Sequence, residues 1–389
     1  MGIALATVYA PLPAVALETH DPLRQPTSPV ATAGQFYSAR IRVLDKVWIP
    51  ALNESITFKV AGVGGVPATG VDSVALNIAA ASEPGRESNG ELVVSPSGSA
   101  DSEAAATAYN SSFYAQNLVI AKVGPDGHLK ITNPNAARVL VYADVHGYTL
   151  RTAGATAGTR FVPLKPARIG RVNVPANASY TLAPLGQAGI PTTGVSHAAF
   201  TITAKSATKG KLTVHPSGQP RPGDTNLDYG QNQYHQNHVF AQLGADGKVI
   251  ISNAGSAAVT VDVDAAGYFT TSETDAAAQT IKTLQPANLT GYITIPAQGT
   301  HILTPLGKGG IPANGVSAVA ISIFTVGRSG ALRIFPSGTP AAVTHAVSIL
   351  PDLLYRGFIP AKLGADGKIA ILNSSSSPVT ARIASFAYF

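Results

Sequence analysis

The pentapeptide Gly244-Ala245-Asp246-Gly247-Lys248 recurs at a fixed spacing in this chain of 389 residues. Gly124-Pro125-Asp126-Gly127 precedes it by 120 residues, and Gly364-Ala365-Asp366-Gly367-Lys368 follows it by 120 residues. An Asp-Gly pair between two apolar runs is a strong signal for a β-hairpin, because both residues tolerate the positive φ that tight hairpin turns require. The pentapeptide therefore marks the same hairpin in three copies of one unit.

Unrelated residue types keep the same spacing. A Pro-Ser-Gly tripeptide, an asparagine and a tyrosine each occur three times, as Pro96-Ser97-Gly98, Pro216-Ser217-Gly218 and Pro336-Ser337-Gly338, as Asn133, Asn253 and Asn373, and as Tyr148, Tyr268 and Tyr388. A constant period in unrelated residues is the signature of a repeated structural unit. We therefore divide the chain into an N-terminal arm (1–35) and three repeats (36–150, 159–270 and 277–389), each of the size of a typical domain.

The composition and the local patterns favour strands. Only 12% of the residues are charged, while the chain contains 38 glycines and 28 prolines, which is typical of short strands joined by tight turns. Each repeat holds seven or eight segments with strand character and no convincing helical period; Ser55–Val60, for example, alternates as a half-buried strand does. We predict an all-β chain of three tandem, antiparallel, β-sandwich-like repeats with a 120-residue period.

Several classes of partner are disfavoured. The net charge of +6 is spread along the chain without a Lys/Arg cluster, so nucleic-acid binding is not predicted, and no run is long enough to span a membrane. The absence of cysteine excludes disulfides and thiolate metal sites. Met1–Leu17 is apolar, but it lacks basic residues and is interrupted by Pro11 and Pro13, so we interpret it as an ordered arm and not as a signal peptide.

Catalytic and metal-binding patterns are also missing. Asp126, Asp246 and Asp366 each sit in an Asp-Gly turn, where the carboxylate bonds local amides, so we favour a structural role for them. His235 and His238 are three residues apart and would face opposite sides of a strand, which is poor geometry for a shared metal. No Gly-x-Ser-x-Gly elbow and no nucleophile-histidine-acid set is present. We expect no enzymatic activity, no metal and no cofactor.

The loop between Pro-Ser-Gly and the Asp-Gly hairpin differs most among the repeats. In the first two repeats it carries tyrosines and amides that could stack on and bond to a sugar: Tyr229, Tyr234, Asn226 and Asn232 in the second, and Tyr109 and Tyr114 in the first. Ile349 and Leu354 replace the two tyrosines in the third repeat, which suits a subunit contact better. Two interpretations stay open. The favoured one has the tyrosines capping the core as part of an edge strand, and the other makes them a glycan-binding surface.

The repeated landmarks resemble a family of tandem domains found in secreted actinobacterial surface proteins and in minor tail or surface proteins of actinobacteriophages. The second repeat carries the resemblance best, with His215-Pro216-Ser217-Gly218, Gly244–Lys248 and Asp264-Ala265-Ala266-Gly267-Tyr268-Phe269. The first keeps Arg42-Val43-Leu44-Asp45 but continues with Lys46, where the family has threonine. The resemblance covers all but the arm and implies the fold, but it brings no catalytic motif.

Our first hypothesis is a non-enzymatic structural or binding protein on the surface of an actinobacteriophage virion, of minor tail, decoration or fibre type, that also contacts host wall glycans. Met1 without a secretion signal favours assembly from the cytoplasm. The arm would bind other virion proteins, and the chain would either seat its three repeats around a threefold position or form a homotrimer. The alternative is a secreted actinobacterial cell-wall- or glycan-binding protein, located outside the cell or on the wall. A glycan-degrading enzyme ranks last, because no specific catalytic acid can be named.

Overall fold

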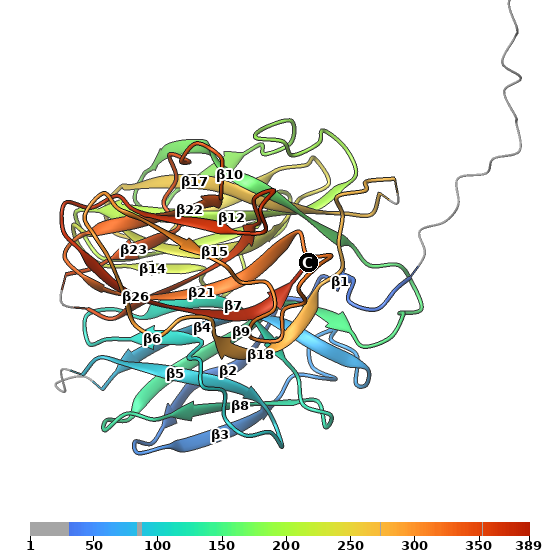
Figure 1. Ribbon diagram of the computed structural model, residues 1–389, viewed down its shortest axis with the longest axis horizontal. Coiled ribbons are helices and arrows are strands. Elements are labelled where there is room, and N and C mark those ends of the chain that lie inside the picture. The colour runs from blue at the N-terminus through green and yellow to red at the C-terminus, as the bar shows by residue number, and fades with distance from the viewer. Residues whose placement is uncertain (1–30, 84–87, 273, 352) are drawn as a thin grey trace, which may run out of the picture.

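The computed structural model describes residues 31–83, 88–272, 274–351 and 353–389 (Figure 1). Residues 1–30 of the predicted arm lie outside the described residues. All regular elements in the described part are strands, and no helix there is long and apolar enough to cross a membrane. Antiparallel strands pair throughout, so the prediction of an all-β, antiparallel chain is confirmed.

The first repeat contains two antiparallel sheets. Its strands are β1 (Phe36–Tyr37), β2 (Ile41–Ile49), β3 (Glu54–Lys59), β4 (Val71–Ser82), β5 (Gly90–Pro96), β6 (Thr107–Tyr109), β7 (Ala115–Lys122), β8 (His128–Asn133) and β9 (Val139–Leu150). One sheet has the order β1-β9-β4-β7, with β2 also paired to β9, and the other has the order β3-β8-β5-β6.

The second repeat has the same arrangement. Its strands are β10 (Arg160–Val174), β11 (Ser179–Leu182), β12 (Val195–Ser206), β13 (Gly210–Pro216), β14 (Leu227–Tyr229), β15 (His235–Gln242), β16 (Val249–Asn253) and β17 (Val259–Thr270). The two sheets are β10-β17-β12-β15 and β11-β16-β13-β14.

The third repeat, like the first, divides its opening strand in two, whereas the second has the single strand β10. Its strands are β18 (Lys282–Asn288), β19 (Ile293–Ile295), β20 (Thr300–Leu303), β21 (Ala318–Gly327), β22 (Gly330–Pro336), β23 (Val347–Ile349), β24 (Tyr355–Lys362), β25 (Ile369–Asn373) and β26 (Val379–Tyr388). Its sheets are β18-β26-β21-β24, with β19 also paired to β26, and β20-β25-β22-β23. Counting the split opening strands as one, every repeat places its eight strands in the orders 1-8-3-6 and 2-7-4-5, the strand order of a jelly roll.

The repeated motifs meet in space. The Ser97 hydroxyl in the Pro-Ser-Gly turn donates to the carboxylate of Asp126 in the hairpin turn, and Ser217 does the same to Asp246. A Cβ on Gly124 would lie 2.0 Å from the Ser97 Oγ, so the close approach of the two turns requires glycine. The constant spacing of these motifs therefore reflects one contact between two turns of a repeat.

The periodic asparagine joins three segments of each repeat. Asn253 Nδ2 donates to the carbonyl oxygens of Val174, Pro175 and Ala257, at 3.2, 3.0 and 2.9 Å. Asn133 and Asn373 make the equivalent set of bonds in the other two repeats. One buried amide thus satisfies three carbonyl groups that the chain reversals leave without strand partners.

The three repeats close into a ring. Strands β7, β15 and β24, which are equivalent by position, contact one another around the centre, where Figure 1 places β7 and β15. Each also contacts a short strand of the next repeat: β7 contacts β14, β15 contacts β23, and β24 contacts β6. The third repeat therefore packs back on the first, and the chain forms a pseudo-threefold arrangement of six sheets.

The centre of the ring is apolar and shared. The equivalent side chains of Leu118, His238 and Phe358 are at most 1% exposed. One hydrophobic cluster contains most of the core of the first repeat together with Phe161, Phe240 and Phe269 of the second and Phe358, Phe386 and Phe389 of the third. Burial of this shared surface holds the three repeats in one body.

Candidate functional site between the first and second repeats

Three of the six residues predicted as a glycan surface are buried. Tyr109, Tyr229 and Asn226 are at most 1% exposed. The Tyr229 hydroxyl donates to Asn253 Oδ1 at 2.8 Å, while Asn226 Oδ1 accepts from the Val214 amide at 2.7 Å. Tyr229 borders a hollow described below, but at this degree of burial none of the three offers a free ring face or amide for stacking. Their burial follows from their place on or beside the short strands β6 and β14, which lie against the core.

The other three lie nearer the surface but apart from one another. Asn232 is exposed in a turn, with φ of +57°, and Tyr234 lies with the ammonium group of Lys205 4.6 Å from its ring centre. Tyr114 lies at the boundary between the first two repeats, where the Lys211 ammonium is 5.3 Å from its ring centre. The structure thus does not gather the six residues into one surface, and glycan binding by them stays a prediction.

Tyr114 borders an elongated hollow that we call the inter-repeat trough. Its central part has a volume of about 620 Å³. It shares lining residues with two neighbouring hollows, one of about 380 Å³ that we call the charged end and one of about 490 Å³ that we call the polar end. The first repeat lines the centre with Trp48, Ser82, Phe113, Tyr114 and Leu140, and the second with Lys209, Gly210, Lys211, Asp228 and Tyr229. Sequence reasoning missed Trp48, although it is the only tryptophan in the chain and such residues are enriched at binding surfaces.

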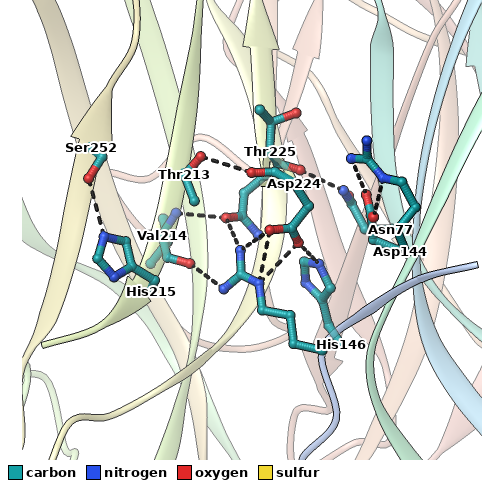
Figure 2. Close-up of polar contacts among 12 residues, drawn as sticks. Asn77, Asp144, His146, Thr213, Val214, His215, Asp224, Thr225 and Ser252 are labelled. Carbon is teal, nitrogen blue, oxygen red and sulfur yellow. Dashed lines mark hydrogen bonds and ion pairs between the residues drawn. The ribbon is translucent and has the colours of Figure 1, made fainter. Parts of the chain in front are cut away.

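A buried ion-pair network joins the two repeats at the charged end of the trough. Figure 2 shows His146 and Asp224 turned toward each other, and His146 Nε2 lies 2.9 Å from Asp224 Oδ2. Arg40 donates from Nε to both carboxylate oxygens at 3.1 and 3.0 Å, and from Nη1 to the Val214 carbonyl at 2.7 Å. Burial alone would raise the pKa of Asp224, but the hydrogen bond and charge of His146 and the guanidinium of Arg40 outweigh it, so the net shift is downward.

Side-chain amides complete this boundary. Gln116 Nε2 donates to Thr225 Oγ1 at 2.8 Å, and its Oε1 accepts from the Asp228 amide at 2.7 Å. Asn77 Nδ2 donates to the Thr225 carbonyl at 2.9 Å (Figure 2). The segment 224–228, which the sequence marks as variable, is therefore held by the first repeat, and its polar groups are already bonded.

The charges along the trough are asymmetric. Its buried carboxylates are paired: Asp144 with Arg42, Asp224 with Arg40 and His146, and Asp228 with Lys211. Lys46, Lys209 and Arg221 are exposed and form no ion pair with the described residues. The charged end also holds an exposed carboxylate, Asp45, which shares Arg42 with Asp144. The three exposed cations outnumber it, so the exposed charge along the trough is positive on balance.

The other two boundaries do not reproduce these features. By strand register, Asn173 and Thr294 take the place of Trp48, and Ala331 and Glu91 take the place of Lys211. Sequence divergence among the repeats has therefore made the first boundary chemically distinct, while the fold of each repeat is kept.

His235 and His238, which are three residues apart in the sequence, lie in separate environments. His235 packs edge-on against Phe113 of the first repeat, with ring centres 4.3 Å apart, and His238 packs against Phe240 at 5.6 Å. No group of three or more His, Asp or Glu side chains that could hold a metal ion is found within the described ranges.

Comparison with protein-family models finds no match, and no curated protein matches the chain. Among solved structures, the major capsid protein P2 of bacteriophage PM2 is 11% identical, with a TM-score of 0.18, over 59% of this chain and 98% of P2. A chain of Sulfolobus turreted icosahedral virus is 9% identical, with a TM-score of 0.16, over 92% of this chain and 91% of its own. A chain from an archaeal virus described for its triple jelly roll fold is 9% identical, with a TM-score of 0.16, over 92% of this chain and 90% of its own. TM-scores this low do not assign a fold or a function to this chain.

Proposed function

We propose that this chain is a non-enzymatic structural and binding protein on the surface of an actinobacteriophage virion, of minor tail, decoration or fibre type. The observation that supports a structural role is the closed ring, whose repeats share one hydrophobic cluster and bury charged side chains between them. The two sheets of each repeat also contribute to a common core, which supports a sandwich-like module. Jelly-roll modules build capsid and lectin domains, although fold alone does not assign a function.

The ring supports a specific mode of assembly. A single chain already presents three quasi-equivalent repeats around one axis, so we propose that one copy seats at a threefold position of a partner and that no homotrimer is needed. The N-terminal arm (1–35) would bind other virion proteins. Mass photometry of the purified chain should give the mass of a single chain. The mass of three chains would show a stable homotrimer and contradict this proposal.

The location is tested with antibodies raised against the purified chain. We expect gold-labelled antibodies to decorate intact phage particles in electron micrographs, while the wall fraction of uninfected host cells stays unlabelled. Labelling of the host wall without labelling of particles would overturn the virion proposal.

The second candidate function is a secreted actinobacterial cell-wall- or glycan-binding protein, and the trough with its half-exposed Trp48 favours it. Both candidates include contact with wall glycans. A pull-down on washed actinobacterial walls checks that contact, and we expect Trp48→Ala with Tyr114→Ala to reduce the bound fraction at least fivefold. Tyr229→Ala with Tyr234→Ala tests the residues predicted from the sequence alone.

A further inference from the structure

The inter-repeat trough has the form of a site for a chain-like ligand. Its central part shares Tyr114 and Lys211 with the charged end, and Phe113 and Lys209 with the polar end. The total space exceeds what one sugar ring occupies, and pockets of 300 to 1,000 Å³ are typical of small-ligand sites. A ligand that used the whole trough would be extended along the boundary of the two repeats.

Aromatic rings line the centre of the trough. Trp48 is 36% exposed, and the Arg138 guanidinium lies 4.6 Å from its ring centre. That contact restrains the indole, so little rotamer freedom is lost when a ligand stacks on it. Phe113 and Tyr114 add apolar surface beside it. Flat, partly exposed rings of this kind suit the apolar faces of sugar rings.

Charge narrows the class of ligand. Lys46, Lys209 and Arg221 border the trough and form no ion pair with any residue that the structure describes, whereas the buried carboxylates and the exposed Asp45 each have a partner. An anionic ligand would gain from these cations, and a cationic one would be repelled by them. We propose that the inter-repeat trough binds a linear acidic glycan, with sugar rings stacked on Trp48 and Tyr114 and acidic groups beside Lys209 and Arg221. This inference rests on the proposed contact with wall glycans.

The charge requirement is tested with one pair of probes. Oligogalacturonides of four to six sugars and the same oligomers after reduction of their carboxyl groups differ only at C6, where a charged carboxylate becomes a neutral hydroxymethyl group. In titration calorimetry with the full chain, we expect the reduced oligomers to bind at least 10-fold more weakly, and the affinity for the acidic ones to fall with added salt. Equal affinity for both probes would overturn the acidic class, and no binding of either would overturn the proposal as a whole.

Variants locate the site. Lys209→Gln with Arg221→Gln should weaken acidic oligomers about 10-fold and leave the reduced ones unchanged, while Trp48→Ala should weaken both. Lys308→Gln, which removes an exposed lysine of the third repeat that does not line the trough, is the control and should have no effect. Binding that survives Trp48→Ala would place the ligand elsewhere.

The wall pull-down distinguishes a failure of the acidic-glycan proposal from a failure of glycan contact altogether. Wall binding that depends on Trp48 but does not respond to the lysine and arginine variants would keep glycan contact and reject the acidic class. If the parent chain bound neither the oligomers nor the walls, glycan contact itself would be rejected. Antibody labelling of phage particles would then still test the virion location independently.

Discussion

At the scale of single residues, the repeats show paired changes that packing explains. A Cβ on Gly147 would lie 2.0 Å from Cζ of Phe36, and one on Gly267 would lie 2.3 Å from Cζ of Phe161. The third repeat has Ala387 at this position, and by strand register Ile281 stands there in place of the phenylalanine. The missing ring makes room for the methyl group, so the departure from Gly-Tyr-Phe in the third repeat has a steric cause.

This pairing predicts the effect of Gly147→Ala. The new methyl group would overlap the Phe36 ring, and φ at this position is +144°, so we expect a loss of about 1–3 kcal/mol in the free energy of unfolding. Urea unfolding measures it. The double variant with Phe36→Ile should recover part of the loss, and Ala387→Gly should cost only about 0.5–1 kcal/mol. A Gly147→Ala variant as stable as the parent would contradict the steric account.

Buried histidines predict acid sensitivity. Burial lowers the pKa of His197 and His235 to about 4 and that of His238 to about 3, from an ordinary value of 6.5. The unfolded chain therefore binds more protons between about pH 6.5 and 4, so the free energy of unfolding should fall as the pH is lowered through that window. The lowered pKa of Asp224 adds a further loss only below its ordinary value of 3.8.

The measurement is urea unfolding at several pH values between 7.5 and 4.5. His238→Phe copies the side chain that the third repeat has at this position and should flatten the dependence. A urea midpoint that stays constant between pH 7.5 and 4.5 would contradict burial of these imidazoles in the neutral form.

At the scale of elements, each boundary of the ring has its own polar contact at equivalent strand positions. Gln116 and Gln236, on β7 and β15, bond the short strand of the next repeat. On β24 the equivalent residue is Arg356, whose side chain is 1% exposed and which pairs with Glu91 on β5, as Arg382 does from β26. Burial lowers the pKa of Arg356, and the charge of Glu91 opposes that shift. These differences favour one order of repeats around the ring.

The pair at the closing boundary predicts a strong effect of Glu91→Gln. Removing the carboxylate leaves the buried Arg356 charge without its partner, which costs about 3–5 kcal/mol in comparable pairs. The double variant Glu91→Gln/Arg356→Gln, which places a glutamine on β24 as on β7 and β15, should recover most of that loss. Lys248→Ala removes an exposed pair with Asp246 and should cost less than about 1 kcal/mol. If Glu91→Gln and Lys248→Ala lowered the free energy of unfolding equally, the greater importance of the buried pair would be rejected.

At the scale of the whole molecule, the shared hydrophobic cluster predicts a single unfolding unit. Phe161, Phe240 and Phe358 pack in a cluster whose members come from all three repeats, so unfolding of one repeat would expose the apolar surface of its neighbours. Differential scanning calorimetry should show one transition with equal calorimetric and van't Hoff enthalpies. Two or three separate transitions would show that the repeats are stable one by one.

Much of the architecture could be predicted from the sequence because it depends on local chemistry. The Asp-Gly turns, the Pro-Ser-Gly turns and the alternating segments act within a few residues of one another, and their period reports a repeated unit. The sequence alone therefore determined an antiparallel, all-β chain with a 120-residue period. The constant residues Asn133, Asn253 and Asn373 serve that same repeated framework.

The ring and the trough were decided by the tertiary structure. Each is formed by contacts between residues far apart in the sequence, such as Arg40 of one repeat with Asp224 of the next, or Glu91 with Arg356. A repeat period carries no information about which repeat packs on which, so these pairings have no local signal. The same limit applies to Tyr109 and Tyr229, which the sequence offers as candidates for sugar binding but which are buried in the structure. It also applies to Trp48, because the trough that it lines forms only when the first two repeats pack on each other.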